Sequence, residues 1–321
     1  MSSSSFKPAW WLPGPHLQTL WPTICGRRIQ PIPFESERIE LPDGDFLDLT
    51  WVRKNESGPI VILLHGLEGS IRSPYAKGMM QAIYHQKWRG VFMHFRGCSG
   101  EPNRLARSYH SGETGDVSHL AEILKERDPK AKLAAVGFSL GGNVLLKWLG
   151  ETGDQSPLCA AVAVSVPFEL QNAANRIQRG FSQIYQRHFL KCLYKRLSYK
   201  FEHYPAPFEL PPFMDVNTIW EFDDKVTAPL HGFMSAKEYY DKSSSRQFLK
   251  KITVPTLLLQ SEDDPFMTPD VIPHQHELSK AIQLEVCQSG GHVGFVGGKV
   301  PWRPEYWLED RVPKFFEEHL I

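Results

Sequence analysis

Short, uninterrupted apolar runs alternate with helical stretches through most of this chain. PIVILLHG (59–66) and KLAAVGF (132–138) have the length and composition of strands buried on both faces. Between them, GDVSHLAEILKERD (115–128) carries its apolar residues at helical spacing. Strands that alternate with helices favour one architecture, a mostly parallel sheet with helices on both faces.

The same patterns give the expected elements in order. A hairpin is expected around Asp43-Gly44 in residues 38–52, because an Asp-Gly pair between alternating apolar runs favours a tight turn. We expect strands at 59–66, 90–95, 132–138, 158–167, 253–265 and 281–292, and helices at 75–87, 115–128, 141–151 and 305–320.

Residues 168–250 break this rhythm. They contain 16 aromatic residues and no strand–helix alternation, so we expect a cap insertion that lies over the sheet. The core would then consist of residues 1–167 and 251–321. A helical spacing within the insertion joins Ile177, Phe181, Ile184, Tyr185, His188 and Cys192.

Charge and composition exclude several classes of protein. Lys+Arg and Asp+Glu balance at 36 each, so nothing favours a nucleic-acid partner. Five scattered cysteines without a CxxC pair are typical of reduced thiols, and no apolar run reaches the length of a membrane span. We expect a soluble, cytoplasmic protein that needs no metal or organic cofactor, since HExxH and P-loop motifs are absent.

Two surface features could still meet a membrane. The segment from Arg176 to Lys200 carries seven Lys or Arg residues and no acid, and Arg187, Lys191 and Lys195 could attract anionic lipid. The tryptophans at 10, 11 and 21 could touch a bilayer, although anchoring of the N-terminal segment to the core is the simpler interpretation.

VGFSLGGN (136–143) places a serine between two glycines directly after a predicted strand and before a predicted helix. In a G-x-S-x-G turn the serine backbone is strained and its hydroxyl stands above the sheet edge. Gly137 and Gly141 leave room for the close approach of the backbone. Ser139 is therefore the candidate nucleophile.

Acyl transfer also needs donors for the developing oxyanion. The amide of Leu140, directly after the serine, is one candidate, and the loop LLHGLEGS (63–70) supplies Leu67 as the second. His65 in that loop is expected to support the structure rather than to act as a base.

A base and its orienting acid should follow the serine in the order acid, then histidine. The strand ending in TLLLQ is followed by SEDDPF, where we choose Asp264, which precedes the proline, over Asp263 and Glu262. The next strand is followed by SGGHVGF, which places His292 on a glycine-rich loop. Ser139, Asp264 and His292 would form a catalytic triad.

Such a triad predicts hydrolysis of a carboxylic ester through an acyl-enzyme, and the aromatic insertion favours an apolar, lipid-like substrate. Transfer of the acyl group to another acceptor, thioester hydrolysis, and a non-catalytic binding role on the same fold stay open, because the fold does not determine function.

Seven motifs together resemble the α/β-hydrolase superfamily, and more closely its YheT-like branch, which is related to eukaryotic lipid-acting hydrolase-domain proteins. They are KPAWWLPGPHLQTLWP, LLHGLEGS, HFRGCSGEPNR, YHSGETGDV, GFSLGGNVLLKWLGE, SEDDPF and GGHVGF. The resemblance covers nearly the whole chain and implies an α/β-hydrolase fold with carboxylic-ester hydrolase activity. The usual Asp-x-Arg-Gly of the superfamily reads His94-Phe95-Arg96-Gly97 here. Arg96 is expected to anchor its loop, and binding of a substrate phosphate or carboxylate is the alternative.

Overall fold

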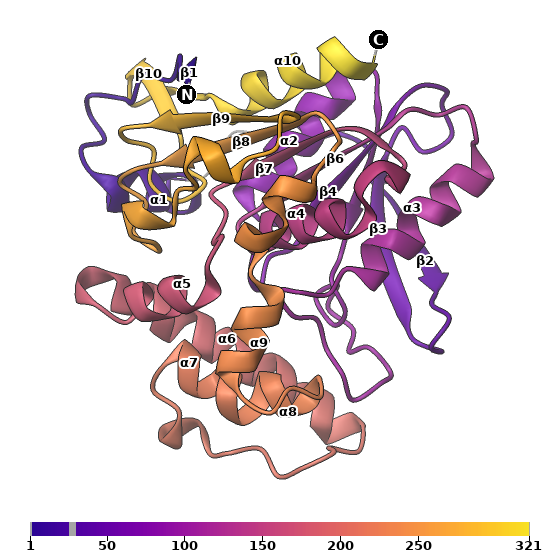
Figure 1. The fold of residues 1–321 in the computed structure, drawn as a ribbon, viewed down its shortest axis with the longest axis vertical. Helices are drawn as coiled ribbons and strands as arrows, with labels where there is room; N and C mark the ends of the chain where they lie inside the picture. The colour runs from indigo at the N-terminus through magenta and orange to yellow at the C-terminus, as the bar shows by residue number, and fades with distance from the viewer. Residues whose placement is uncertain (1, 26–29, 321) are drawn as a thin grey trace.

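One large sheet forms the centre of the molecule (Figure 1). A computed structural model describes residues 2–25 and 30–320. The nine-stranded sheet has the order β1-β9-β8-β7-β6-β4-β5-β3-β2, and β10 and β11 form a separate two-stranded sheet. The strands are β1 (Ser2–Ser3), β2 (Glu35–Glu40), β3 (Phe46–Val52), β4 (Ile60–Leu64), β5 (Arg89–Met93), β6 (Leu133–Phe138), β7 (Leu158–Val164), β8 (Thr256–Ser261), β9 (Ile282–Cys287), β10 (Val296–Val300) and β11 (Arg303–Tyr306).

Ten α-helices join these strands within the described part of the chain. They are α1 (Pro15–Ile24), α2 (Pro74–His85), α3 (Gly115–Arg127), α4 (Leu140–Thr152), α5 (Leu170–Ile177), α6 (Gln183–His203), α7 (Ile219–Phe222), α8 (Ala228–Leu230), α9 (Ala236–Ser243) and α10 (Leu308–Leu320). A π-helical segment, Asp223–Thr227, links α7 to α8. All six strands and all four helices expected from apolar spacing are present, with ends shifted by a few residues.

The sheet is mostly parallel, as expected. Only β3 pairs antiparallel, with β2 on one side and β5 on the other. The predicted hairpin is β2–β3, in which Ile39 lies opposite Leu47. Its turn includes Gly44 at φ +84°, a backbone conformation that glycine adopts without strain.

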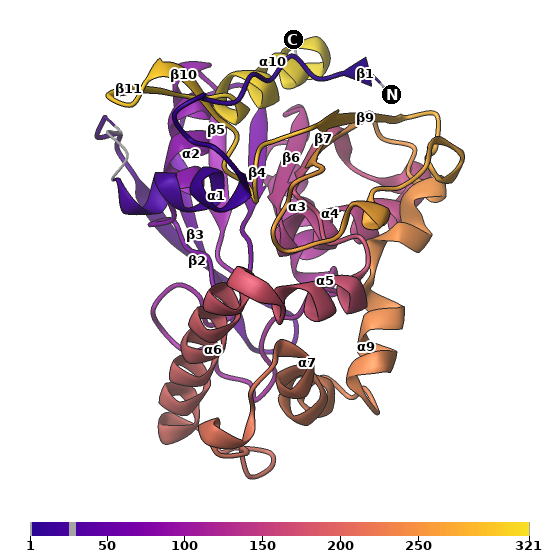
Figure 2. The same cartoon turned by 90° about the vertical axis from the view of Figure 1, so that its left-hand side faces the viewer.

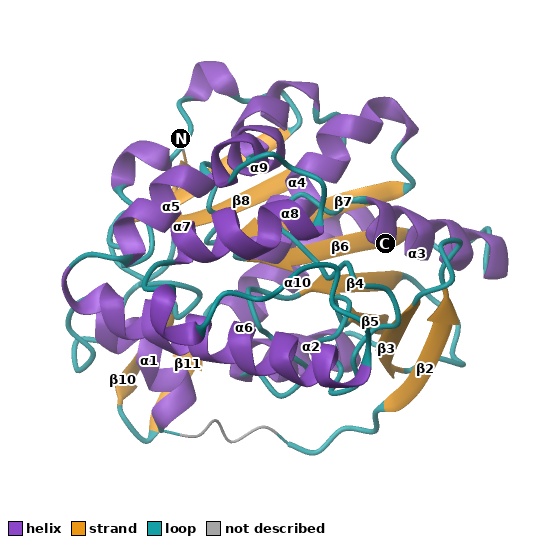
Figure 3. Cartoon of the chain, turned by 90° about the horizontal axis from the view of Figure 1, so that it is seen from below, coloured by secondary structure: helices purple, strands orange, loops and turns teal. Residues whose placement is uncertain are grey.

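Alternate strand residues enter two different apolar layers. Ile62 and Leu64 of β4 pack with α3 and α4, whereas Val61 and Leu63 pack with α2 and α10. Both sets are completely buried, which explains why the strand sequences are continuously apolar. Figure 3 shows the strands with helices on either side. The α/β-hydrolase architecture follows from this arrangement.

The chain between β7 and β8 folds as helices α5 to α9, which lie together below the sheet in Figures 1 and 2. Strand β1 and the end of helix α10 lie at the opposite end of the molecule. The prediction that one helix carries an apolar stripe from Ile177 to Cys192 is wrong in part. The helix is interrupted at Gly180, which has φ +57°, and the side chains of Phe181 and Ile184 are about half exposed.

Two elements near the ends of the chain were not predicted from the sequence patterns. They are α1, which contains Pro22, and the β10–β11 hairpin, which has little apolar alternation. The two are joined to each other, since the Trp11 indole donates to the Gly298 carbonyl at 3.0 Å and packs on Trp21. The tryptophans therefore anchor the N-terminal segment, although the Trp10 side chain stays exposed.

None of the helices in residues 2–25 and 30–320 combines the length and the apolar character needed to cross a bilayer.

Candidate active site

Ser139 lies between the end of β6 and the first residue of α4. Its backbone is strained, with φ 52° and ψ −119°. A Cβ at Gly137 would come within 2.5 Å of the Gly141 carbonyl oxygen, and a Cβ at Gly141 would meet the Leu64 and His65 carbonyl oxygens at 2.5 Å. Only glycine fits at either position, so the two glycines of the motif allow the sharp turn that exposes the hydroxyl.

Three side chains that are distant in sequence meet above this turn. The distance from Ser139 Oγ to His292 Nε2 is 2.9 Å, and His292 Nδ1 lies 2.8 Å from Asp264 Oδ2. A carboxylate only accepts hydrogen bonds, so Nδ1 carries the proton and Nε2 is free to accept from the serine hydroxyl. The three residues occur along the chain in the order serine, acid, histidine. In space they form one row of hydrogen bonds in which the histidine lies between the serine and the acid.

Helix α1 supports the loop that carries His292. The His292 amide donates to Thr19 Oγ1 at 2.9 Å, and the Gln18 side chain both accepts from the Val296 amide and donates to its carbonyl. The Val293 amide donates to Ser165 Oγ at 3.0 Å. Sequence reasoning missed these supports, because no local pattern links residues 18 and 19 to residue 292.

The two neighbouring aspartates occupy different positions. Asp264 accepts from the Phe266 amide at 2.8 Å in addition to His292, whereas Asp263 accepts from the Gly291 amide at 2.9 Å. The Phe266 ring stacks on the His292 imidazole with 4.0 Å between ring centroids. Asp264 therefore orients the imidazole directly, and Asp263 holds the loop behind it.

The loop after β4 lies against the serine. A Cβ at Gly66 would be 3.2 Å from Ser139 Cβ, and the next residue is Leu67. Leu140 begins α4, so its amide has no partner within the helix. No hydrogen bond from the Leu67 amide is found within residues 2–25 and 30–320. Both amides proposed as oxyanion donors thus lie beside the serine and remain available.

His65 is buried behind this loop. Its Nε2 accepts from the Phe95 amide at 3.1 Å, and its Nδ1 donates to the Gly66 carbonyl at 2.7 Å. Burial lowers the pKa of His65 to about 3, so the ring is neutral. These contacts match the structural role expected for it.

An ion pair joins this loop to helix α6. Arg196 Nε donates to Glu68 Oε1 at 2.9 Å, and Arg196 Nη1 donates to Ser108 Oγ at 2.6 Å. The Tyr109 hydroxyl donates to the same Glu68 oxygen and accepts from the Glu68 amide. Helix α6 therefore contacts the residue directly after Leu67.

Arg96 is an anchor, as expected. Its guanidinium donates two hydrogen bonds to Asp116, at 2.8 and 2.6 Å, and further bonds to Asp43 and Asp45. The side chain is only 4% exposed and faces carboxylates of its own chain.

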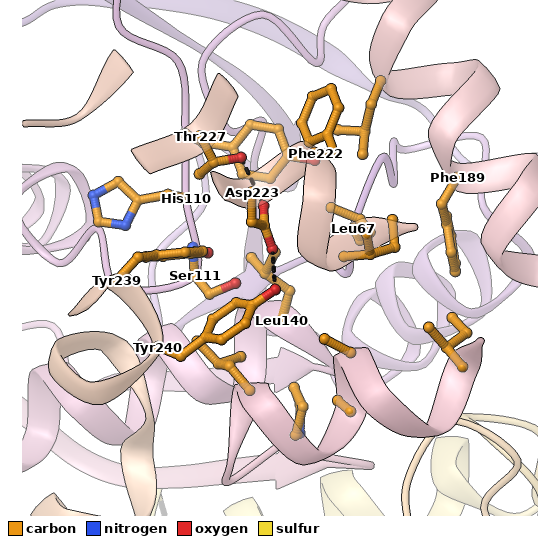
Figure 4. Close-up of a pocket in the computed structure, with 18 of the residues that line it drawn as sticks. Leu67, His110, Ser111, Leu140, Phe189, Phe222, Asp223, Thr227, Tyr239 and Tyr240 are labelled. Carbon is orange, nitrogen blue, oxygen red and sulfur yellow. Dashed lines mark hydrogen bonds between the residues drawn. The ribbon is translucent and has the colours of Figure 1, made fainter. Parts of the chain in front are cut away.

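A pocket of about 1000 Å³, including its open mouth, extends from Ser139 and His292 into the helices between β7 and β8. Much of its wall is apolar, and Figure 4 shows Leu67, Leu140, Phe189 and Phe222 around it. An apolar pocket beside a nucleophile suits an acyl chain or another apolar group. Across the described residues there is no cluster of three or more His, Cys, Asp or Glu side chains suited to a metal ion.

A strained serine at the carboxyl end of a mostly parallel sheet, in hydrogen-bond contact with a histidine–aspartate pair, defines the α/β-hydrolase class. Residues 59–299 match the family described as alpha/beta hydrolase fold. The chain belongs to this superfamily and, within it, to the YheT-like family, which confirms the resemblance seen in the motifs.

Similar proteins have been given names that describe ester and lipid hydrolysis. "Putative esterase YheT" of Escherichia coli K12 is 43% identical over 99% of this chain and 95% of its own length. The mouse phospholipase ABHD3 is 28% identical over 91% of this chain and 73% of its own. Monoacylglycerol lipase of Saccharomyces cerevisiae is 29% identical, covering 76% of this chain and 56% of its own.

Solved structures agree on the fold. The Pyrococcus furiosus esterase Pf2001 superposes with a TM-score of 0.60 at 16% identity, covering 90% of this chain and 92% of that one. Likeness at this identity concerns the fold alone.

Proposed function

We propose that the protein is a serine hydrolase that cleaves carboxylic esters with apolar, lipid-like acyl groups. The observation that carries the proposal is the pair of contacts at His292, 2.9 Å to the Ser139 hydroxyl and 2.8 Å to the Asp264 carboxylate. This is the geometry in which a histidine activates a serine.

In the proposed reaction, His292 Nε2 takes the proton of Ser139 while Oγ attacks the ester carbonyl. Asp264 keeps the imidazole in the required tautomer and stabilises its charged form. The Leu67 and Leu140 amides donate to the oxyanion of the tetrahedral intermediate. His292 then protonates the leaving alcohol, and a water molecule deprotonated by the same ring releases the acyl group from the serine.

The apolar wall of the pocket supports an apolar substrate, as do the names of the relatives, which include a phospholipase and a monoacylglycerol lipase. Each additional buried CH₂ group contributes about 0.8 kcal/mol. We therefore expect kcat/KM for p-nitrophenyl esters to rise with acyl length until the chain fills the pocket.

A fluorophosphonate probe tests the proposal. Labelling of Ser139 that is lost in Ser139→Ala and strongly reduced in His292→Ala, in variants that keep the fold, is the expected result. Folded wild-type protein that neither reacts with the probe nor hydrolyses any ester of the series would refute the proposal and favour a binding role.

We also propose a cytoplasmic location, since all five cysteines are unpaired and the compartment keeps thiols reduced. Fractionation of cells expressing the full chain would test it, and recovery mainly from an oxidising compartment would contradict it.

A further inference from the structure

One part of the pocket wall carries polar side chains among its apolar lining. Asp223, Thr227, Tyr239 and Tyr240 line it, all from the helices between β7 and β8. Figure 4 shows Asp223 between Thr227 and Tyr240, with a hydrogen bond to each. The proposed reaction uses none of these side chains.

The side chains of the protein occupy only part of the hydrogen-bond acceptor capacity of the Asp223 carboxylate. Thr227 Oγ1 donates to Asp223 Oδ1 at 2.7 Å, and the Tyr240 hydroxyl donates to Oδ2 at 2.6 Å. A carboxylate can accept about four hydrogen bonds, so further acceptor positions remain. No Lys, Arg or His side chain in residues 2–25 and 30–320 forms an ion pair with it.

The nearby nitrogen groups do not supply a compensating charge. Arg196 also lines the pocket, but its guanidinium binds Glu68 and Ser108. Burial lowers the pKa of His110 to about 3 and that of His231 to about 2, so both rings are neutral at pH 7. A carboxylate in this position is costly unless something else pairs with it.

The backbone at this wall is also unusual. Asp223 begins a π-helical segment that runs to Thr227, and both residues face the pocket. Single π-helical turns are rare and are found frequently at functional sites, where they redirect side chains. Two independent features, an unpaired carboxylate and an irregular helix, therefore coincide on the pocket wall.

From this geometry we infer that Asp223 binds a hydrogen-bond-donating group of the substrate, an alcohol hydroxyl or an ammonium, at a position remote from the ester. The rings of Tyr239, Tyr240, Phe222 and His110 line the same region, and aromatic faces also favour a cation. The inference rests on the proposed function, because the reacting ester must lie at Ser139. The preferred substrate is then an apolar chain with a polar distal end, rather than a plain alkyl ester.

Matched esters test this. The first series consists of p-nitrophenyl alkanoates of graded acyl length, in three sets whose acyl chains end in a methyl, a hydroxyl or an ammonium group. A second series of esters carries the same three end groups on the alcohol part of the ester instead. At the length that reaches Asp223, we expect wild type to prefer a donor-bearing ester over its methyl counterpart by about tenfold or more in kcat/KM. The hydroxyl and ammonium sets distinguish the two donors.

Variants of Asp223 test whether this residue causes the preference for donor-bearing esters. Asp223→Asn should lower the preference about tenfold, and Asp223→Leu should reverse it in favour of the methyl ester, since the donor would be buried without a partner. Asp241→Asn, on the exposed side of α9, is the matched control and should keep the wild-type ratio. Because the measure is a ratio within one variant, a uniform loss of active protein does not affect it.

The outcomes separate the two proposals. If fluorophosphonate labels Ser139 and esters are cleaved, but no set shows a preference or the preference persists in Asp223→Asn, this inference is wrong and the hydrolase remains. If the probe does not label the folded protein and no ester is cleaved, the proposed function fails and this inference fails with it.

Discussion

Asp263 and Asp264 are adjacent in the chain and only one of them contacts the histidine. Asp264 Oδ2 lies 2.8 Å from His292 Nδ1, and Asp263 Oδ1 accepts from the Gly291 amide instead. The pKa of Asp263 is raised by burial. At the scale of single residues, position relative to one ring nitrogen decides the role of each carboxyl group.

Exchange of these aspartates for asparagine should therefore have unequal effects. In Asp264→Asn no carboxylate accepts the hydrogen bond from Nδ1–H of His292, and kcat should fall about 10³–10⁴-fold. Asp263→Asn keeps an oxygen for the Gly291 amide and should lose less than about tenfold. Steady-state kinetics on one p-nitrophenyl ester measures both, and equal losses would contradict the assignment of Asp264.

Asp223 should make stability depend on pH. Burial raises its pKa from 3.8 to about 6, so between these values the folded protein binds more protons than the unfolded chain. The contribution of Asp223 to the free energy of unfolding thus falls as pH rises through this window. Asp223→Asn has no carboxyl group that titrates in this window. The free energy of unfolding of the variant minus that of wild type should therefore be about 2–3 kcal/mol larger above pH 6 than below pH 4.

Urea unfolding of both proteins at several pH values measures this difference directly. A difference that stays constant across the window would show that Asp223 titrates near its ordinary value. The gain above pH 6 would also show that the carboxylate is retained at a cost in stability, as is common for binding groups.

At the scale of elements, helix α6 couples the helices over the sheet to the loop that holds Leu67. The Arg196 and Glu68 side chains are 14% and 10% exposed, so the pair is largely shielded from water. Arg196→Met should lower the free energy of unfolding by about 3–5 kcal/mol, because Glu68 is left unpaired. It should also lower kcat, since the Leu67 amide loses its neighbouring support.

A double-mutant cycle with Glu68→Gln checks the coupling. Adding Glu68→Gln to Arg196→Met should recover part of the lost stability, because the uncompensated charge is removed. Strictly additive effects on stability, or an unchanged kcat in Arg196→Met, would argue against the link to the loop.

Helix α1 is the second element on which the site depends. Gln18 is 1% exposed and bonds both backbone groups of Val296, just after the His292 loop. Gln18→Leu should cost about 1–3 kcal/mol in the free energy of unfolding, since the buried Val296 amide loses its acceptor. Leu17→Ala, at an exposed position of the same helix, should change it by less than about 0.5 kcal/mol. Urea unfolding compares the two, and similar losses would mean that α1 contributes only general packing.

At the scale of the whole molecule, one outer face combines positive charge with apolar groups. Arg187, Lys191 and Lys195 of α6 are exposed, as are the side chains of Ile184 in its first turn and of Phe181 just before it. Arg196 and Lys200 of the same helix are turned inward, where they donate hydrogen bonds to Glu68 and Asn103. We expect the exposed Arg187, Lys191 and Lys195 to attract anionic lipid.

Replacing Arg187, Lys191 and Lys195 together by Gln should weaken binding to vesicles that contain anionic lipid by on the order of 100-fold, at about 1 kcal/mol per charge. Added salt should weaken the wild type in the same direction. The control changes Lys237, Lys242 and Lys250 to Gln, which removes the same charge from exposed positions elsewhere. Equal vesicle binding by both triple variants, measured by co-sedimentation, would mean that the α6 face is simply solvated.

Much of the fold could be predicted from local sequence patterns. A run such as VILLH has to be buried, and a parallel sheet buries it on both faces, so β4, β6, β7 and β8 could be predicted with small errors at their ends. Strand β2 and its turn followed from Asp43-Gly44. Helix α6 was placed less well, because the spacing could not reveal the break at Gly180.

By itself, the sequence determined which strand ends carry Ser139, Asp264 and His292, because a glycine-flanked serine and the order of the three residues are local features of the chain. Tertiary structure alone decided what surrounds them. Thr19 and His292 are 273 residues apart, and the Glu68–Arg196 pair spans 128, so no pattern within one element could reveal either contact. The physical reason is that apolar periodicity specifies which faces are buried, whereas the partner of a buried polar group depends on how distant segments pack.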